Sequence, residues 1–130
     1  GIKGAVCIAD CILHARSGAS KDDIKRLAAD QYGYNVGQSS QAIRQTNTFD
    51  ATCQVTVPQA IVCFLESADF ESAIRLAVSI GGDSDTIAAI TGSIAEAFYG
   101  IPEHIKANVL SYLPDEMRCV VTDFEEGYGQ

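Results

Sequence analysis

Apolar residues recur along most of the chain at the spacing of amphipathic helices. Near the N-terminus the apolar positions that share one helix face are Ala5, Ile8, Ala9, Ile12 and Leu13. No convincing alternation of apolar and polar residues, which would indicate a half-buried strand, interrupts this pattern. The sequence therefore predicts an all-α, multi-helix globular bundle.

Capping and helix-breaking residues separate the predicted helices. Residues 20–23 have the spacing of a capping box, with Asp23 in place of the usual Glu. Pro58 is expected at the first position of a helix, where proline is well tolerated. A long helix is predicted from about residue 85 to residue 99. The other helix ends are marked by Gly18, Gly33, Ser39 or Ser40, Asp69, Gly81, Gly100, Pro102 and Pro114.

The length of 130 residues predicts one all-α domain over residues 1–130. No internal repeat, low-complexity tract or interdomain linker is evident, and the tail from residue 125 to residue 130 is expected to fray. Hydrophobic residues make up 47% of the chain, which argues against disorder.

The charge balance is strongly acidic. Nine basic residues stand against 17 acidic ones, for a net charge of −8. This argues against a nucleic-acid phosphate backbone or an anionic membrane as a partner, and it permits cations. No signal peptide or membrane-length apolar run is present.

An odd number of cysteines without close pairing favours free thiols in a reducing compartment. A cytoplasmic location follows by default, and the cysteines are better interpreted as small buried hydrophobes than as metal ligands. The five are Cys7, Cys11, Cys53, Cys63 and Cys119.

The densest chemistry lies in residues 83–86, where two carboxylates and two hydroxyls follow a glycine pair. Oxygen ligands of this kind suit Mg²⁺, Mn²⁺ or Ca²⁺. The same residues could instead be a helix cap, since Asp and Ser are common N-caps. One cap needs only one side-chain oxygen, so the additional oxygens favour a metal site. The small residues that follow predict a helix at the centre of the bundle.

Residues 81–100 resemble the C-terminal signature of the ADP-ribosylglycohydrolase family. Other segments agree in order, so the resemblance covers nearly the whole chain. These segments are residues 3–5, 49–54, 57–60 and 69–74.

The resemblance implies an all-α fold with a pair of Mg²⁺ or Mn²⁺ ions at its centre. It implies hydrolysis of the bond between ADP-ribose and an acceptor side chain, with an ADP-ribosylated protein or an ADP-ribose derivative as partner. Asp83 and Asp85 would supply carboxylate ligands and Thr86 a hydroxyl ligand. The expected substrate-contacting residues are Gly81, Gly82 and Ser84.

One departure from the family pattern is serious. The family carries its other metal ligands in a Ser/Thr-Asp-Asp motif near the N-terminus, and this chain has none; Asp22 and Asp23 lie in the capping box. The chain is therefore expected to be the C-terminal portion of the family fold and to hold at most one ion, weakly. Glu96 is expected to be a buried carboxylate with a structural hydrogen bond.

The missing ligands leave an alternative open, in which the chain is a non-catalytic ADP-ribose-binding or protein-interaction module. An incomplete bundle should also expose an apolar face. Self-association, or a partner chain that covers this face, is expected.

Overall fold

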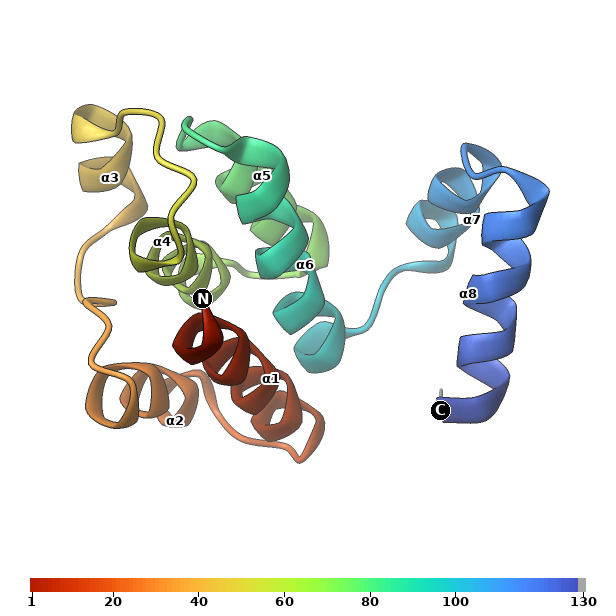
Figure 1. Cartoon of the computed structure of the whole chain (residues 1–130), viewed down its shortest axis with the longest axis horizontal. Coiled ribbons are helices and arrows are strands. Elements are labelled where there is room, and N and C mark those ends of the chain that lie inside the picture. The colour runs from red at the N-terminus through yellow and green to blue at the C-terminus, as the bar shows by residue number, and fades with distance from the viewer. Residues whose placement is uncertain (129–130) are drawn as a thin grey trace. The chain divides into compact units, whose positions relative to one another are not determined.

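The computed structural model describes residues 1–128, and no strand occurs among them. The predicted all-α class is confirmed (Figure 1). Gly129 and Gln130, the end of the tail expected to fray, lie outside the described residues, but α8 continues to Tyr128. The elements are α1 (Ile2–Arg16), α2 (Lys21–Arg26), the π-helix η1 (Leu27–Gln31), α3 (Ser40–Thr46), α4 (Cys53–Glu66), α5 (Phe70–Ser79), α6 (Ser84–Tyr99), α7 (Glu103–Ser111) and α8 (Asp115–Tyr128).

The chain divides into two compact units, Gly1–Gly100 and Ile101–Gln130. The first holds α1 to α6, and the second holds α7 and α8. Within the second unit, Lys106 forms an ion pair of 2.7 Å with Glu125, which ties α7 to α8. The expectation of a single domain over residues 1–130 stays a prediction.

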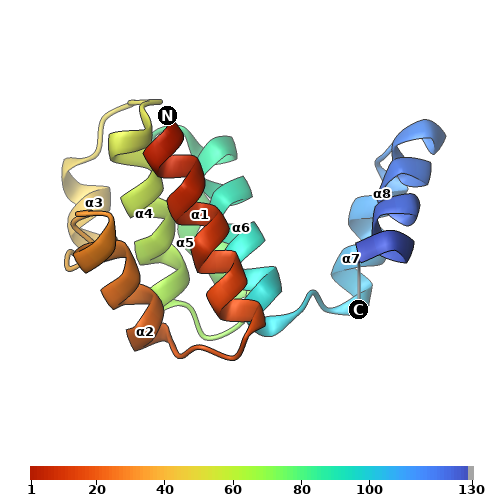
Figure 2. The same cartoon turned by 60° about the horizontal axis from the view of Figure 1, so that its bottom comes forward.

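Helix α6 packs against α1, α4 and α5 within the first unit (Figures 1 and 2). The buried hydroxyl of Thr91 donates to the carbonyl oxygen of Ala60 at 2.9 Å, linking α6 to α4. A Cβ atom at Gly92 would lie 3.0 Å from Cδ1 of Ile74, so the missing side chain lets α5 approach closely. The close packing predicted for this helix is confirmed, whereas its central position stays a prediction.

The helix predicted at the N-terminus is confirmed as α1, but its predicted buried face is wrong. Leu13 is 60% exposed, and the buried residues are instead Gly4, Cys7, Cys11 and Ala15. A Cβ atom at Gly4 would lie 3.2 Å from both Cys53 Cβ and Val57 Cγ2. Small residues therefore form the contact face of α1, because α4 lies too close for branched side chains.

Several predicted helix ends are confirmed. Ser20 and Asp23 form the predicted capping box of α2, and Asp69 caps α5 in a second box with Ser72. Pro58 was expected at a first helical position and lies instead inside α4, which begins at Cys53. Proline there supplies no N–H to the preceding turn, but this part of α4 is buried, and its packing offsets the lost hydrogen bond.

Candidate functional site

The residues predicted for the site lie in the turn between α5 and α6, which we call the acidic loop (Gly81–Thr86). Gly81 and Gly82 both have positive φ, at 80° and 71°. Two successive left-handed residues strongly favour glycine, because a Cβ atom strains this conformation. The glycine pair reverses the chain after α5, and α6 then begins at Ser84 with Asp83 as its N-cap residue.

The two acidic side chains of the loop lie together. The side chains of Asp83 and Asp85 are close enough to interact, and this contact is the largest cause of the lowered pKa of Asp85. The backbone N–H of Thr86, 3.0 Å from Asp85 Oδ1, lowers the pKa further. Two carboxylates this close can bind one cation between them.

The Asp83 side chain makes no capping hydrogen bond to α6. The side chain of an N-cap residue normally accepts a hydrogen bond from a backbone N–H group in the first turn of the helix. Because Asp83 makes no such bond, the alternative that residues 83–86 serve only as a helix cap is less favoured. The N–H of Ser84 instead donates to the carbonyl oxygen of Gly82 at 3.0 Å.

The hydroxyl residues of the loop are less well placed than the carboxylates. Within residues 1–128, neither the Ser84 nor the Thr86 hydroxyl makes a hydrogen bond, and Thr86 is exposed. The structure thus brings Asp83 and Asp85 together and leaves Thr86 free to turn toward or away from them. The roles predicted for Gly81, Gly82, Asp83, Ser84, Asp85 and Thr86 stay predictions.

The loop alone provides only part of a metal coordination shell. Across residues 1–128, no cluster of three or more His, Cys, Asp or Glu side chains could hold a metal ion. Asp83 and Asp85 supply two anionic oxygen donors of the kind that Mg²⁺ and Mn²⁺ accept. The donor chemistry fits such an ion, and the number of donors fits at most a weakly held one.

Two other acidic positions lie outside the loop. Asp23 accepts the backbone N–H of Ser20 at 3.0 Å, which lowers the pKa of Asp23 and agrees with its predicted role in a cap. Glu96 was expected to be buried and is exposed, because it lies on the side of α6 that no neighbouring helix covers. It makes no side-chain hydrogen bond among the described residues.

Hydrogen bonds that involve three other residues converge on the end of α5, directly before the loop, and the sequence analysis did not identify these residues. Asn47, in the segment after α3, donates to the carbonyl oxygen of Ile80 at 3.1 Å. Gln59 of α4 donates to Asn47 Oδ1 at 3.0 Å. Arg44 of α3 bonds the backbone oxygen and the hydroxyl of Ser79, at 3.1 and 2.7 Å.

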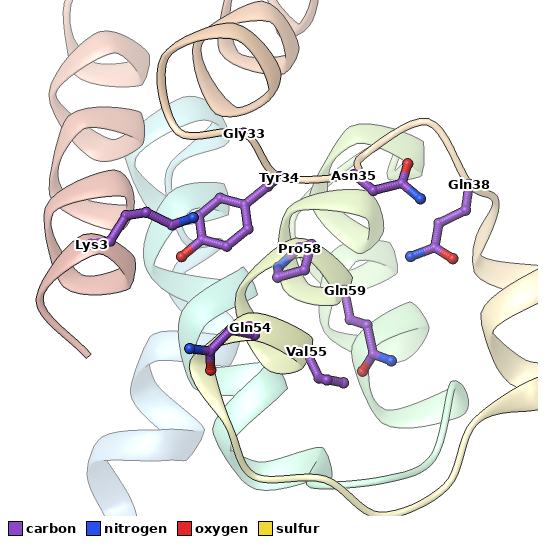
Figure 3. A pocket seen from close by; sticks show the side chains of 9 residues that line it. All are labelled: Lys3, Gly33, Tyr34, Asn35, Gln38, Gln54, Val55, Pro58 and Gln59. Atoms are coloured by element: carbon purple, nitrogen blue, oxygen red, sulfur yellow. The ribbon is translucent and has the colours of Figure 1, made fainter.

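A pocket of about 330 Å³ lies beside the start of α4 (Figure 3). Its wall contains carboxamide, aromatic and apolar groups and one cation, but no acidic side chain. The amino group of Lys3 lies 4.5 Å from the centre of the Tyr34 ring, over its face. None of the residues predicted for the site lines this pocket. Its lining is Lys3, Gly33, Tyr34, Asn35, Gln38, Gln54, Val55, Pro58 and Gln59.

Comparison with known proteins identifies a related family. The sequence model described as ADP-ribosylglycohydrolase matches residues 1–128. The curated relatives include ADP-ribosylhydrolase ARH3 from Homo sapiens, 39% identical over 59 residues, and from Bos taurus and Mus musculus, each 41% identical over 59 residues. Each match covers 37% of this chain and 16% of the relative.

No solved structure gives a significant match. Among the described residues, no helix is both long and apolar enough to cross a membrane.

Proposed function

The chain belongs to the ADP-ribosylglycohydrolase family, and from this premise we propose that its acidic loop forms part of a metal-dependent site for hydrolysing the bond between ADP-ribose and an acceptor side chain. The observation that carries the proposal is the contact between the Asp83 and Asp85 carboxyls on a two-glycine turn. Because the chain matches only 16% of the length of the curated relatives, the activity of a whole protein is itself a proposal.

The acidic loop would hold Mg²⁺ or Mn²⁺ through Asp83 and Asp85, with the Thr86 hydroxyl as a further ligand. Such an ion, when bound, orients substrate oxygens and supplies an activated water. Gly81 and Gly82 would let the backbone pass close to the ion or the substrate. The N-terminus of α6 carries the partial positive charge of the helix dipole, which favours anionic substrate groups nearby.

The substrate proposed is an ADP-ribosylated protein or an ADP-ribose derivative. The net charge of −8 agrees with a site that recruits a cation before an anionic substrate. All five cysteines are free thiols, which supports a reducing compartment such as the cytoplasm.

The proposal is tested by measuring Mn²⁺ binding by electron paramagnetic resonance, together with release of ADP-ribose from arginine-linked and serine-linked substrates with and without a chelator. Asp85→Asn should weaken Mn²⁺ binding by about tenfold or more, since it removes an anionic ligand. Asp69→Asn, an acidic residue in the cap of α5, is the matched control and should leave Mn²⁺ affinity unchanged. Absence of metal-dependent release from every linkage would defeat the hydrolase proposal.

A non-catalytic ADP-ribose-binding module is the second candidate. The pocket favours it, because its wall has one cation and no acidic side chain and can accept an anionic nucleotide without a metal. Calorimetric titration with ADP-ribose in the presence of a chelator separates the two candidates. Tight metal-free binding without hydrolysis supports the module, whereas binding that requires Mn²⁺ supports the hydrolase.

A further inference from the structure

We propose that Asn47, oriented by Gln59, is a positioning residue that fixes the acidic loop in the conformation that brings Asp83 and Asp85 together. The inference rests on the proposed function, because positioning matters only if the two carboxylates share a ligand. Asn47 comes from the segment between α3 and α4 and lies 33 residues before the carbonyl group that it bonds.

Both ends of the Asn47 carboxamide are engaged. Its nitrogen donates to the Ile80 oxygen at 3.1 Å, and its oxygen accepts from Gln59 Nε2 at 3.0 Å. Gln59 is only 8% exposed and lies on α4, which packs against α6. The carboxamide therefore has one orientation, and the rigid bundle sets it.

The bond to Ile80 satisfies a carbonyl group that the helix leaves without a partner. Ile80 is the C-cap residue of α5, and the N–H four residues later, on Ser84, donates to Gly82 instead. Helix ends leave such carbonyl groups unpaired unless a side chain, water or a turn satisfies them. Asn47 serves as that side chain, directly before the glycine pair.

The same carboxamide fills the space beside Gly82. A Cβ atom built at Gly82 would lie 2.8 Å from Asn47 Nδ2, closer than real Cβ contacts. At Gly81 a Cβ atom would have no neighbour within 4 Å. Asn47 thus restricts the backbone at Gly82, where glycine would otherwise have more conformational freedom than other residues.

Arg44 provides a second tie that acts on the end of α5. It is exposed, and its two bonds go to Ser79, before the glycines. It can hold the end of α5, but it does not restrict Gly81 or Gly82. Among the described residues outside the loop, Asn47 therefore has the contacts that determine how the chain enters α6.

The test compares Asn47→Ala with Thr48→Ala, an exposed neighbour whose side chain makes no hydrogen bond among the described residues. Backbone order parameters of residues 81–85 are measured by ¹⁵N relaxation without metal, and Mn²⁺ affinity is measured by electron paramagnetic resonance. Asn47→Ala should lower the order parameters from about 0.85 to below about 0.6. It should also weaken Mn²⁺ binding by about tenfold, and Thr48→Ala should change neither quantity.

Gln59→Met serves as a second variant if Asn47→Ala does not fold. It keeps most of the buried volume, removes the donor to Asn47, and should give a smaller change in the same direction. Unchanged order parameters, or a loosened loop that binds Mn²⁺ as tightly as before, overturns the positioning role. If the unaltered chain binds no Mn²⁺ but Asn47→Ala still loosens the loop, the result supports the positioning contact and counts against the proposed metal site.

Discussion

At the scale of single residues, Gly81 and Gly82 have the same backbone conformation in different surroundings. Both have positive φ, so both should be strained by any side chain. Gly81 faces open space, whereas Gly82 lies against the Asn47 carboxamide. Comparing substitutions at the two positions therefore separates the cost of backbone strain from the cost of displacing Asn47.

We expect Gly81→Ala to lower the free energy of unfolding by about 1 kcal/mol, the usual cost of a left-handed alanine. Gly82→Ala should cost about 1 to 3 kcal/mol more, because the new methyl group displaces a side chain held at both ends. Urea denaturation of each single variant measures the difference. In an Asn47→Ala background the two glycine substitutions should lower the free energy of unfolding by the same amount. If Gly82→Ala still cost more there, the extra cost would not come from displacing Asn47.

The sequence identified the acidic loop because its signal is local. A glycine pair followed by Asp83 and Asp85 is visible within a few residues. The contacts from Asn47 and Gln59 were not predicted, because they join positions 33 and 12 residues apart. Nothing in their spacing indicates that these side chains meet; only the packing of α4 against the turn brings them together.

At the scale of elements, capping boxes are the clearest link between sequence and helix ends. Asp69 accepts the backbone N–H of Ser72 at 2.7 Å, and Ser72 Oγ accepts the N–H of Asp69 at 3.0 Å. The bond from Ser72 lowers the pKa of Asp69. The cap should therefore contribute most when Asp69 is ionised.

Asp69→Ala should destabilise the chain by about 1 kcal/mol at neutral pH, the usual cost of losing an N-cap. The folded-state pKa of Asp69 is below its unfolded value, so its ionised form stabilises the fold above the unfolded pKa of about 3.9. As pH falls through the lower folded value, this part of the stability is lost, and the gap between Asp69→Ala and the parent chain should narrow. Urea midpoints measured at pH 7 and at about pH 3 check this.

Glu71→Ala is the control for the cap. Glu71 lies in the same helical turn and forms an exposed ion pair of 2.8 Å with Arg75. Such pairs contribute little, so the change should stay within about 0.5 kcal/mol at both pH values. An equal effect of the two substitutions would contradict the importance of the cap.

Helix ends could be predicted from sequence more reliably than helix faces. The ends at Ser20 and Asp69 depend on a few adjacent residues. The buried face of α1 depends on what packs against it, and α4 and α6 lie close enough to select Gly4 and Cys7 over larger side chains. The predicted helix start at Pro58 was wrong for the same reason. Proline locally favours a helix start, but packing places Pro58 inside α4.

At the scale of the whole molecule, α1 carries an exposed apolar stripe that includes Leu13, one of the residues predicted to be buried. Ile2, Val6 and Leu13 are 84%, 47% and 60% exposed and lie on one side of the helix. Exposed apolar side chains that line up in this way are typical of interaction surfaces. We define these three residues as the α1 stripe and expect a second copy of the chain to cover it.

The net charge of −8 should oppose this association. Two copies that approach each other repel electrostatically, and salt screens the repulsion over about 10 Å at 0.1 M ionic strength. We therefore expect reversible self-association that strengthens as salt is raised from about 0.05 M to about 0.5 M, measured by sedimentation velocity over a range of protein concentrations. Polar contacts between the copies would give the opposite trend.

Leu13→Ser should weaken self-association by about tenfold or more, because burying one leucine contributes about 1.5 to 3 kcal/mol and a symmetric contact loses it twice. Val78→Ser is the matched control: Val78 on α5 is 55% exposed and lies outside the α1 stripe. Both substitutions make the surface less apolar, but only Leu13→Ser changes the α1 stripe. Val78→Ser should therefore leave the association constant unchanged. A chain that stays monomeric at every concentration and salt, or that responds equally to both substitutions, would show that a second copy does not cover the stripe.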